Sequence, residues 1–287
     1  MSNKFKKLSL GVITVAAAAL LVACGNSSSS SKTQESSSAK KEQIVIATDG
    51  DTKPYSYVVD GKPTGYDVEL AKKVFEKLPE YDAKVEVTEF NSILTGIDAG
   101  RYQVGANNIG WSEERSKKYI YSYPVSKTDN AIATRKGDNV SSLDDLSGKS
   151  TEASAGVNYT EILLNWNKSN PDKKEIVVNY ADNLPLGTRL GDVESKKVDF
   201  VLHDTISLNT VIKDQGYDLQ VSPIKIKDDG NAYSGKDFFI FANDEEGKKL
   251  EEKVNKVLAD FEKDGTLKEL SKKFFNGNFV PDASDYK

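Results

Sequence analysis

The sequence contains few of the residues that usually cross-link a chain or bind a metal. Its 287 residues include one cysteine, one histidine and one methionine. The single cysteine, Cys24, has no partner for a disulfide bond within the chain and no second thiol for a metal site. We therefore expect no metal and no cofactor. We also expect the fold to depend on its hydrophobic core alone.

The long apolar run of the chain lies near its start. It extends from Leu8 to Val22, follows three lysines and ends in the letters LVAC. A basic start, a short apolar run and small residues before a cleavage point are typical of an export signal. LVAC resembles the bacterial lipobox, in which the cysteine receives a diacylglyceryl group and becomes the mature N-terminus. We expect residues 1–23 to be a signal peptide and Cys24 to carry lipid. An ordinary signal peptide with an incidental cysteine is the alternative.

Residues 24–41 lack large apolar side chains and are rich in serine. Such a segment cannot offset the entropy cost of ordering, so we expect a flexible tether. Two acyl chains and a tether would hold a mobile domain at the membrane. Loss of residues 1–23 leaves 264 residues and changes the formal net charge from −5 to −8. This negative charge argues against nucleic acid as a partner.

The rest of the chain alternates between strand and helix patterns. A β-branched run at 43–49 is followed by a helical pattern at 64–78, and the same alternation continues to residue 106. A second series includes expected helices at about 158–168 and 185–195. Such alternation is typical of α/β lobes with a parallel sheet. Extended segments link the two series, so we expect the ligand site in a cleft between two lobes, at strand carboxyl ends.

One short stretch, NNIGWSEER at 107–115, follows an expected strand at 102–106. Ser112 and the acidic residues after it favour a helix start. Gly110 would let a ligand approach the backbone, and Arg115 offers a planar fork suited to a carboxylate. These features together predict an anion pocket. The alternative is that Arg115 pairs with a neighbouring glutamate on a solvated helix.

Several long motifs then occur in a characteristic order: DGKPTGYDVELAKKV, EFNSILTGIDAGRYQV, NNIGWSEERSKKYIYSYP, SAGVNYTEIL and KVDFVLHD. From Ile44 to Phe275 the chain resembles the extracellular binding proteins of polar amino-acid ABC importers, family 3. The resemblance implies an α/β, two-lobed periplasmic-binding-protein-like fold of type II, with a helix-flanked sheet in each lobe and two hinge crossings. It places lobe 1 at 42–130 plus 235–287 and lobe 2 at 131–234.

The resemblance also assigns ligand contacts. Arg115 would grip the ligand carboxylate with help from the Gly110 backbone N–H, and the first N–H groups of a helix beginning at Val157 and Asn158 would meet the carboxylate from the other side. Val157 stands where the family often has serine or threonine, so its contact would be through the backbone alone. The remaining assignments are the Asn107 main-chain carbonyl and Asp204 for the ammonium group, and Phe90 and Tyr55 for packing on the ligand.

NNIGWSEER and GVNY most resemble the cystine-binding branch, although glutamine or another polar amino acid would suit the same side chains. The resemblance implies a monomer that delivers its ligand to the permease and ATPase of an ABC importer. It would work on the extracellular face of a Gram-positive-type membrane.

Two other functions are open, a surface adhesin and a dehydratase-type enzyme on the same scaffold. We expect no enzyme, because no serine or cysteine nucleophile partners His203. Consecutive strand residues also point to opposite faces, so His203 should face away from the cleft if Asp204 faces it.

Overall fold

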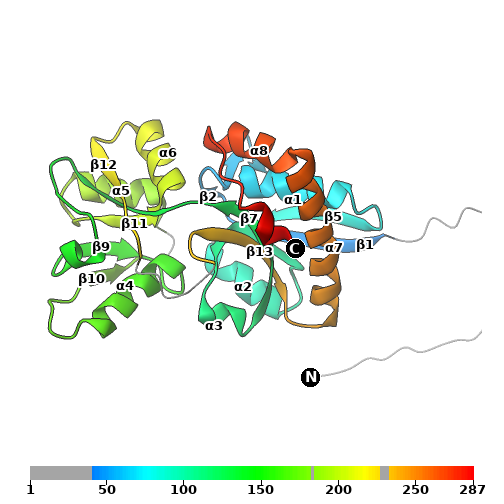
Figure 1. Ribbon diagram of the computed structural model, residues 1–287, viewed down its shortest axis with the longest axis horizontal. Coiled ribbons are helices and arrows are strands. Elements are labelled where there is room, and N and C mark those ends of the chain that lie inside the picture. The colour runs from blue at the N-terminus through cyan, green and yellow to red at the C-terminus, as the bar shows by residue number, and fades with distance from the viewer. Residues whose placement is uncertain (1–40, 182–183, 227–232) are drawn as a thin grey trace, which may run out of the picture. The chain divides into compact units, whose positions relative to one another are not determined.

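The computed structural model describes residues 41–181, 184–226 and 233–287. The predicted signal peptide, Cys24 and nearly all of the predicted tether lie outside these residues. The described helices and strands form two lobes (Figure 1). Lobe 1 is built around a five-stranded sheet, and lobe 2 around a three-stranded and a two-stranded sheet.

The lobe 1 sheet has the strand order β5-β1-β6-β13-β7. Its strands are β5 (Tyr81–Val87), β1 (Glu42–Thr48), β6 (Val104–Gly110), β13 (Lys236–Ala242) and β7 (Tyr119–Lys127). Strand β1 is parallel to β5 and β6, whereas β13 is antiparallel to both β6 and β7. The sheet is therefore mixed. The prediction of a parallel sheet was wrong for this lobe. The physical reason is that β13 enters lobe 1 from lobe 2, against the direction of the other strands.

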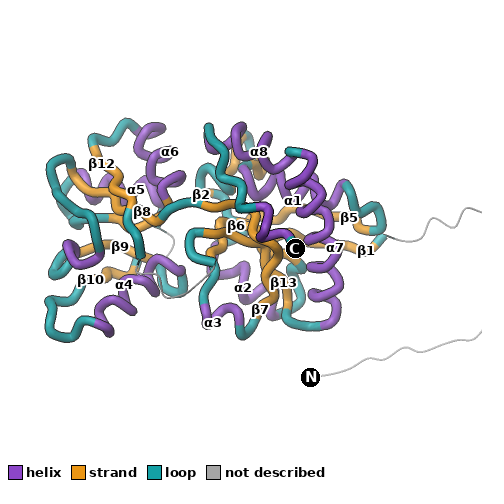
Figure 2. The backbone as a smooth tube through the Cα atoms, viewed as in Figure 1, coloured by secondary structure: helices purple, strands orange, loops and turns teal. Residues whose placement is uncertain are grey.

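Helices cover both faces of this sheet (Figure 2). Because side chains alternate along a strand, β1 directs Ile44 and Ile46 to one face and Ala47 to the other. The first face packs on α1 (Tyr66–Glu76), α7 (Glu245–Asp264) and α8 (Thr266–Phe275), and the second on α2 (Phe90–Asp98). The other lobe 1 elements are β2 (Asp51–Thr52), β3 (Ser56–Val59), β4 (Lys62–Thr64), α3 (Glu113–Ser116) and η2 (Ala283–Tyr286).

Lobe 2 has β8 (Asn130–Arg135) between β11 (Val201–Asp204) and β12 (Leu219–Pro223), both antiparallel to it. Parallel strands β9 (Ser150–Ala153) and β10 (Val177–Tyr180) lie beside β11, since the Phe200 amide donates to the Ser150 carbonyl. Helix α4 (Asn158–Ser169) packs on one side, and α5 (Leu186–Glu194) and α6 (Thr205–Gln215) on the other. The short helix η1 spans Leu143–Leu146. Helices α4 and α5 confirm the two predicted from the pattern.

Two crossings join the lobes, as predicted. The chain passes from β7 of lobe 1 to β8 of lobe 2 through residues 128–129, and after β12 of lobe 2 it re-enters lobe 1 as β13. Thr128, before β8, and Gly235, before β13, lie side by side, because the Thr128 N–H donates to the Gly235 carbonyl at 2.8 Å. Gly235 has φ +71°, and a Cβ there would lie 2.2 Å from the Thr128 oxygen. Only glycine fits this contact.

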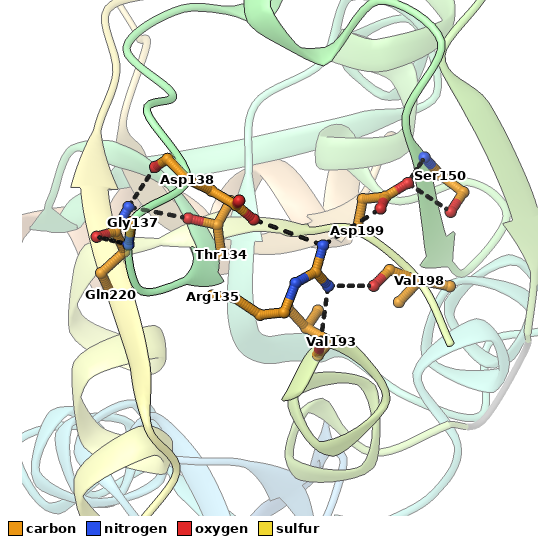
Figure 3. Close-up of polar contacts among 9 residues, drawn as sticks. All are labelled: Thr134, Arg135, Gly137, Asp138, Ser150, Val193, Val198, Asp199 and Gln220. Carbon is orange, nitrogen blue, oxygen red and sulfur yellow. Dashed lines mark hydrogen bonds and ion pairs between the residues drawn. The ribbon is translucent and has the colours of Figure 1, made fainter. Parts of the chain in front are cut away.

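Arg135, at the end of β8, connects this strand to the C-terminal end of helix α5 in lobe 2 (Figure 3). Its Nη1 donates to the carbonyls of Val193 at 2.9 Å and Val198 at 3.0 Å, where the chain leaves α5. Its Nη2 lies 3.4 Å from Asp199, which also accepts from the Ser150 amide at 2.9 Å. One guanidinium thus joins β8, the α5 end and the β9 start.

No helix in the described part of the chain is both long enough and apolar enough to cross a membrane.

We predict that Arg135→Lys destabilises the fold. Lysine keeps the charge but not the planar fork, so the two carbonyls and Asp199 cannot all be satisfied. We expect the free energy of unfolding to fall by about 1–3 kcal/mol, measured with urea. The neighbouring Lys136 pairs with Asp218 at an exposed site, and Lys136→Ala should cost only about 0–1 kcal/mol. Equal losses in the two variants would contradict this assignment.

Candidate functional site

A cavity of about 600 Å³ lies between strand ends of lobe 1 and helix starts of lobe 2. Polar side chains dominate its lining, among them Asp49, Asn107, Asn108, Asn158, Arg189 and His203. A second cavity of about 870 Å³ shares Asn158 and Tyr159 with the first and reaches Gly110 and Trp111. The Asn158 side chain lies so close to Gly110 that a Cβ there would be 2.7 Å from its Nδ2. We refer to the two cavities together as the cleft.

The residues assigned from the resemblance fall into two groups. Five of them line the cleft: Phe90, Asn107, Gly110, Val157 and Asn158. The other three, Tyr55, Arg115 and Asp204, are buried, with at most 6% of each exposed. Each of these three makes a contact between the lobes.

Arg115 is held where α3 begins. Ser112 is the predicted N-cap, and its side chain accepts from the Arg115 amide at 3.2 Å. Arg115 Nη1 donates to the Gly110 carbonyl of lobe 1 at 2.7 Å, and Nη2 to the Gly156 carbonyl of lobe 2 at 3.4 Å. Its Nε is buried with no hydrogen-bond partner among the described residues. The fork therefore spans the gap between the lobes and keeps one donor unused.

The alternative for Arg115, a pair with a neighbouring glutamate, is wrong. Glu113 instead pairs with Lys117 at 2.9 Å, and Glu114 with Lys118 at 3.6 Å, on the exposed side of α3. The stretch Asn107–Gly110 also differs from the prediction, since it belongs to β6 and does not follow it. Its turn-like composition is explained by Asn108, which adopts φ +48° inside the strand. Asparagine tolerates this left-handed conformation better than most residues.

Asp204 is contacted from both lobes. From lobe 1, Tyr55 Oη donates to Oδ1 at 3.3 Å and Asn108 Nδ2 donates to Oδ2 at 3.0 Å. From lobe 2, the Ser207 amide donates to Oδ1 at 2.8 Å, and His203 Nδ1 lies 2.7 Å from Oδ2. Burial acts to raise the pKa of Asp204, but the His203 and Ser207 interactions hold it below its ordinary value.

His203 was predicted to face away from the cleft, but it faces the cleft. It lines the first cavity, contacts Asp204 and lies against the Tyr159 ring, with ring centres 4.4 Å apart. The expected alternation fails because Asp204 is both the last residue of β11 and the N-cap of α6. Its side chain turns toward the helix start, which brings it beside the preceding histidine. The letters HDTIS carry this signal, since an aspartate before a new helix favours a cap.

A group of acceptors surrounds Asn108, which the sequence analysis did not assign a role. Asp67 Oδ2 accepts from the Asn108 amide at 2.6 Å. Asp67 Oδ1 and Asn108 Oδ1 are buried and have no hydrogen-bond partner among the described residues. With Asp204 close by, this region offers more acceptors than the fold uses. An ammonium group, with three donors and no acceptor, fits such a region.

Gly65 allows Tyr55 and Asp67 to lie close together. It precedes α1 with φ +120°, and a Cβ there would lie 2.3 Å from the Tyr55 carbonyl oxygen. That same carbonyl accepts from the Asp67 amide at 3.0 Å. The glycine of the TGYD motif thus allows Tyr55 and Asp67 to approach each other beside Asp204.

Asn107 uses its side chain within lobe 1. Its Oδ1 accepts from the Asp49 amide at 2.6 Å, and its Nδ2 donates to the Asp49 carboxylate at 2.8 Å. Burial raises the pKa of Asp49 to about 6. The Asn107 side chain therefore positions Asp49 at the cleft wall. The ligand contact expected of Asn107 involves its main-chain carbonyl, so the two roles use different atoms.

In residues 41–181, 184–226 and 233–287, no group of three or more histidine, cysteine, aspartate or glutamate side chains could hold a metal ion.

Residues 44–277 match the family model of the bacterial extracellular solute-binding proteins, family 3. The chain belongs to this family. It is 33% identical to the probable amino-acid-binding protein YxeM of Bacillus subtilis over 80% of this chain and 83% of that protein. It is 29% identical to the L-cystine-binding protein TcyJ of Escherichia coli over 82% and 83%, respectively.

Solved structures agree with the family assignment. One comes from work on glutathione import through GshT and the cystine importer TcyBC of Streptococcus mutans. It is 36% identical to this family 3 protein, with a TM-score of 0.79 over 85% of this chain and 99% of that one. The two-lobed type II fold is thus shared with proteins of known structure.

We predict that Asp67 makes stability depend on pH. Burial raises its pKa from 3.8 to about 7. Between these values the folded protein holds a proton that the unfolded chain releases, so the free energy of unfolding falls as pH rises. Asp67→Asn keeps the shape and should reduce this fall by at most about 3 kcal/mol, measured with urea at pH 4.5 and pH 8. Asp49 and Asp237 also have raised pKa values and are present in both proteins, so part of the pH dependence should remain in Asp67→Asn. If the free energy of unfolding falls equally in wild type and variant, Asp67 is not its source.

Proposed function

We propose that this family 3 protein binds an amino acid in the cleft between its lobes and delivers it to the permease of an ABC importer. The observation that carries the proposal is the arrangement of charge along β6. Arg115 contacts Gly110 at the strand end, while Asp204 contacts Asn108 two residues earlier. Two strand residues span about 7 Å. A cationic fork and an acidic region thus lie close enough for the carboxylate and ammonium of one zwitterion.

The contacts between the lobes support a closing mechanism. Arg115 reaches the Gly156 carbonyl of lobe 2, and Asp204 accepts from Tyr55 and Asn108 of lobe 1. A ligand carboxylate at Arg115 and a ligand ammonium at Asp204 would replace neutral partners by charged ones, which form stronger hydrogen bonds. Closure excludes water and strengthens both pairs further. The ligand would therefore favour the closed arrangement.

We propose L-cystine as the ligand, with glutamine or another polar amino acid as the alternative. The support is the relation to an L-cystine-binding protein and to a structure from work on glutathione and cystine import. The amide-rich lining, with Asn107, Asn108 and Asn158, suits a polar ligand. Phe90 and Tyr159 line the same cavity and offer flat surfaces for packing.

We predict that Arg115→Lys weakens ligand binding. Lysine keeps the charge but loses the fork, and a charge-assisted hydrogen bond contributes roughly 1.5–3 kcal/mol. Calorimetry with L-cystine and a panel of polar amino acids should show at least about a tenfold loss of affinity for the bound ligand. Arg101→Lys, at an exposed arginine of lobe 1, is the matched control and should bind as the wild type does. Wild-type affinity in Arg115→Lys would exclude the proposed role.

We also propose that Cys24 carries a lipid and that residues 24–41 tether the domain to the extracellular face of the membrane. We separately propose the lobe boundaries 42–130 plus 235–287 and 131–234, although β8 of lobe 2 begins one residue earlier, at Asn130. They are supported by β13, which follows the second crossing and completes the lobe 1 sheet.

For the anchor we predict that Cys24→Ala moves the protein from the membrane fraction to the medium or blocks its processing. Alanine has no thiol, so the diacylglyceryl group cannot attach. Ser28→Ala, four residues along the tether, should leave both unchanged. Fractionation and immunoblotting measure the outcome, and membrane retention of a normally processed Cys24→Ala protein would refute the lipid anchor.

A further inference from the structure

Arg189 is a cation of the cleft that the assignments above leave unused. It lies in the first turns of α5 in lobe 2 and lines the 600 Å³ cavity. Its Nε is buried without a hydrogen-bond partner among the described residues. Burial lowers the pKa of Arg189, and the negative charges of Asp51 and Glu152 only partly offset that effect. The guanidinium is therefore partly desolvated without a full set of partners.

Other cations nearby have partners. Lys53 lines the same cavity and pairs with Asp214 at 2.6 Å. Glu152, whose negative charge acts to raise the pKa of Arg189, directs Oε1 to Lys197 at 2.8 Å, and its Oε2 has no hydrogen-bond partner among the described residues. No ion pair within 4 Å joins Arg189 to a carboxylate of the described residues. A desolvated guanidinium without a partner costs free energy, so its presence in a cavity wall favours an anionic ligand group.

Arg189 lines the first cavity, whereas Arg115 is buried elsewhere between the lobes. Arg115, in α3, contacts the Gly110 carbonyl at the end of β6 and the Gly156 carbonyl just before α4, whereas Arg189 belongs to α5. The cavity between lobe 1 and these helices is lined by Phe90, Asn107 and Tyr159, and its volume lies within the range of about 300–1,000 Å³ that holds drug-sized ligands. A ligand that fills it would extend well beyond an α-carboxylate and an α-ammonium group.

We propose that Arg189 binds a second carboxylate of the ligand, at the end remote from the group held by Arg115. This inference rests on the function proposed above and narrows it. The ligand class is an amino-acid derivative with two separated carboxylates, such as a disulfide-linked diamino diacid or a γ-glutamyl peptide. A planar fork is the side chain best suited to hold such a carboxylate.

The test pairs each diacid with an analogue that lacks the second carboxylate. L-cystine is compared with S-methylthio-L-cysteine, and glutathione with its glycine ethyl ester. Calorimetry measures each affinity for the full mature protein and for Arg189→Gln. We expect the wild type to prefer the diacid of at least one pair. We expect Arg189→Gln to lose about tenfold or more on that diacid, the size expected for a charge-assisted hydrogen bond, and little on its analogue.

Three variants make the outcome specific. Arg189→Lys keeps the charge and should retain part of the preference for the diacid. Lys53→Gln removes a cation of the same cavity that already has a partner, so the ratio of diacid to analogue affinity should stay at the wild-type value. Asp51→Asn should also leave this ratio unchanged. If its effect matches that of Arg189→Gln on both ligands of a pair, Arg189 acts by holding Asp51 across the lobes, and the inference is overturned.

The remaining outcomes separate the inference from the function on which it rests. An unchanged ratio in Arg189→Gln, or a wild type that binds L-glutamine or an analogue as tightly as any diacid, overturns the inference and leaves amino-acid binding intact. A wild type that binds none of the four probes and no polar amino acid overturns the proposed function, and the inference falls with it. Thermal unfolding of Arg189→Gln near the wild-type temperature shows that any loss comes from the site.

Discussion

The arrangement of the lobes depends on how the Asp204 carboxylate is satisfied. A carboxylate has about four lone-pair positions, and Asp204 has four contacts, two from each lobe. The lobe 1 donors, Tyr55 and Asn108, are 149 and 96 residues away in the chain. If the lobes separate, the buried Asp204 carboxylate loses the two contacts from lobe 1. This loss costs several kcal/mol unless water or a ligand replaces the two donors. Any separation of the lobes would therefore require new partners for this carboxylate, together with the loss of the Arg115 contact to the Gly156 carbonyl.

Among the described residues, the neighbourhood of Asp204 holds more acidic than basic side chains. Asp67 and Asp237 are buried close to it, and burial with the mutual repulsion of these carboxylates raises the pKa of both residues and of Tyr55. Protonation relieves this repulsion when no cation is present, because a neutral acid costs less to bury than a carboxylate. An ammonium group would relieve it more directly, by adding the opposite charge and three donors. The same feature that weakens the free protein at neutral pH thus favours a cationic ligand group.

Local patterns predicted several of the helices, and the resemblance predicted five residues of the cleft lining, but neither predicted the side-chain contacts between the lobes. Helices α4 and α5 were predictable because their apolar spacing is written within a dozen residues, and the Ser112 cap because it precedes its helix directly. The extent of β6 was not, since its pairing with β13 joins residues about 130 positions apart. The His203–Asp204 contact was missed because strand alternation was extended to a residue that already caps a helix. Arg189 gave no sequence signal, because its proposed role is inferred from the lack of an ion pair to a carboxylate of the described residues.

Three arginines show how the fold divides its donors between structure and ligand. The Arg135 guanidinium contacts two carbonyls and two carboxylates of lobe 2, so few of its donors remain for a ligand. Arg115 uses two carbonyls, one of them across the cleft, and keeps Nε unused. Arg189 lines the cavity, and among the described residues it has no hydrogen-bond partner for Nε and no ion pair to a carboxylate. Since every arginine carries the same five donors, the difference is set by what surrounds them. The donors that packing leaves unsatisfied at the cleft wall are the ones that an anionic ligand gains most by contacting.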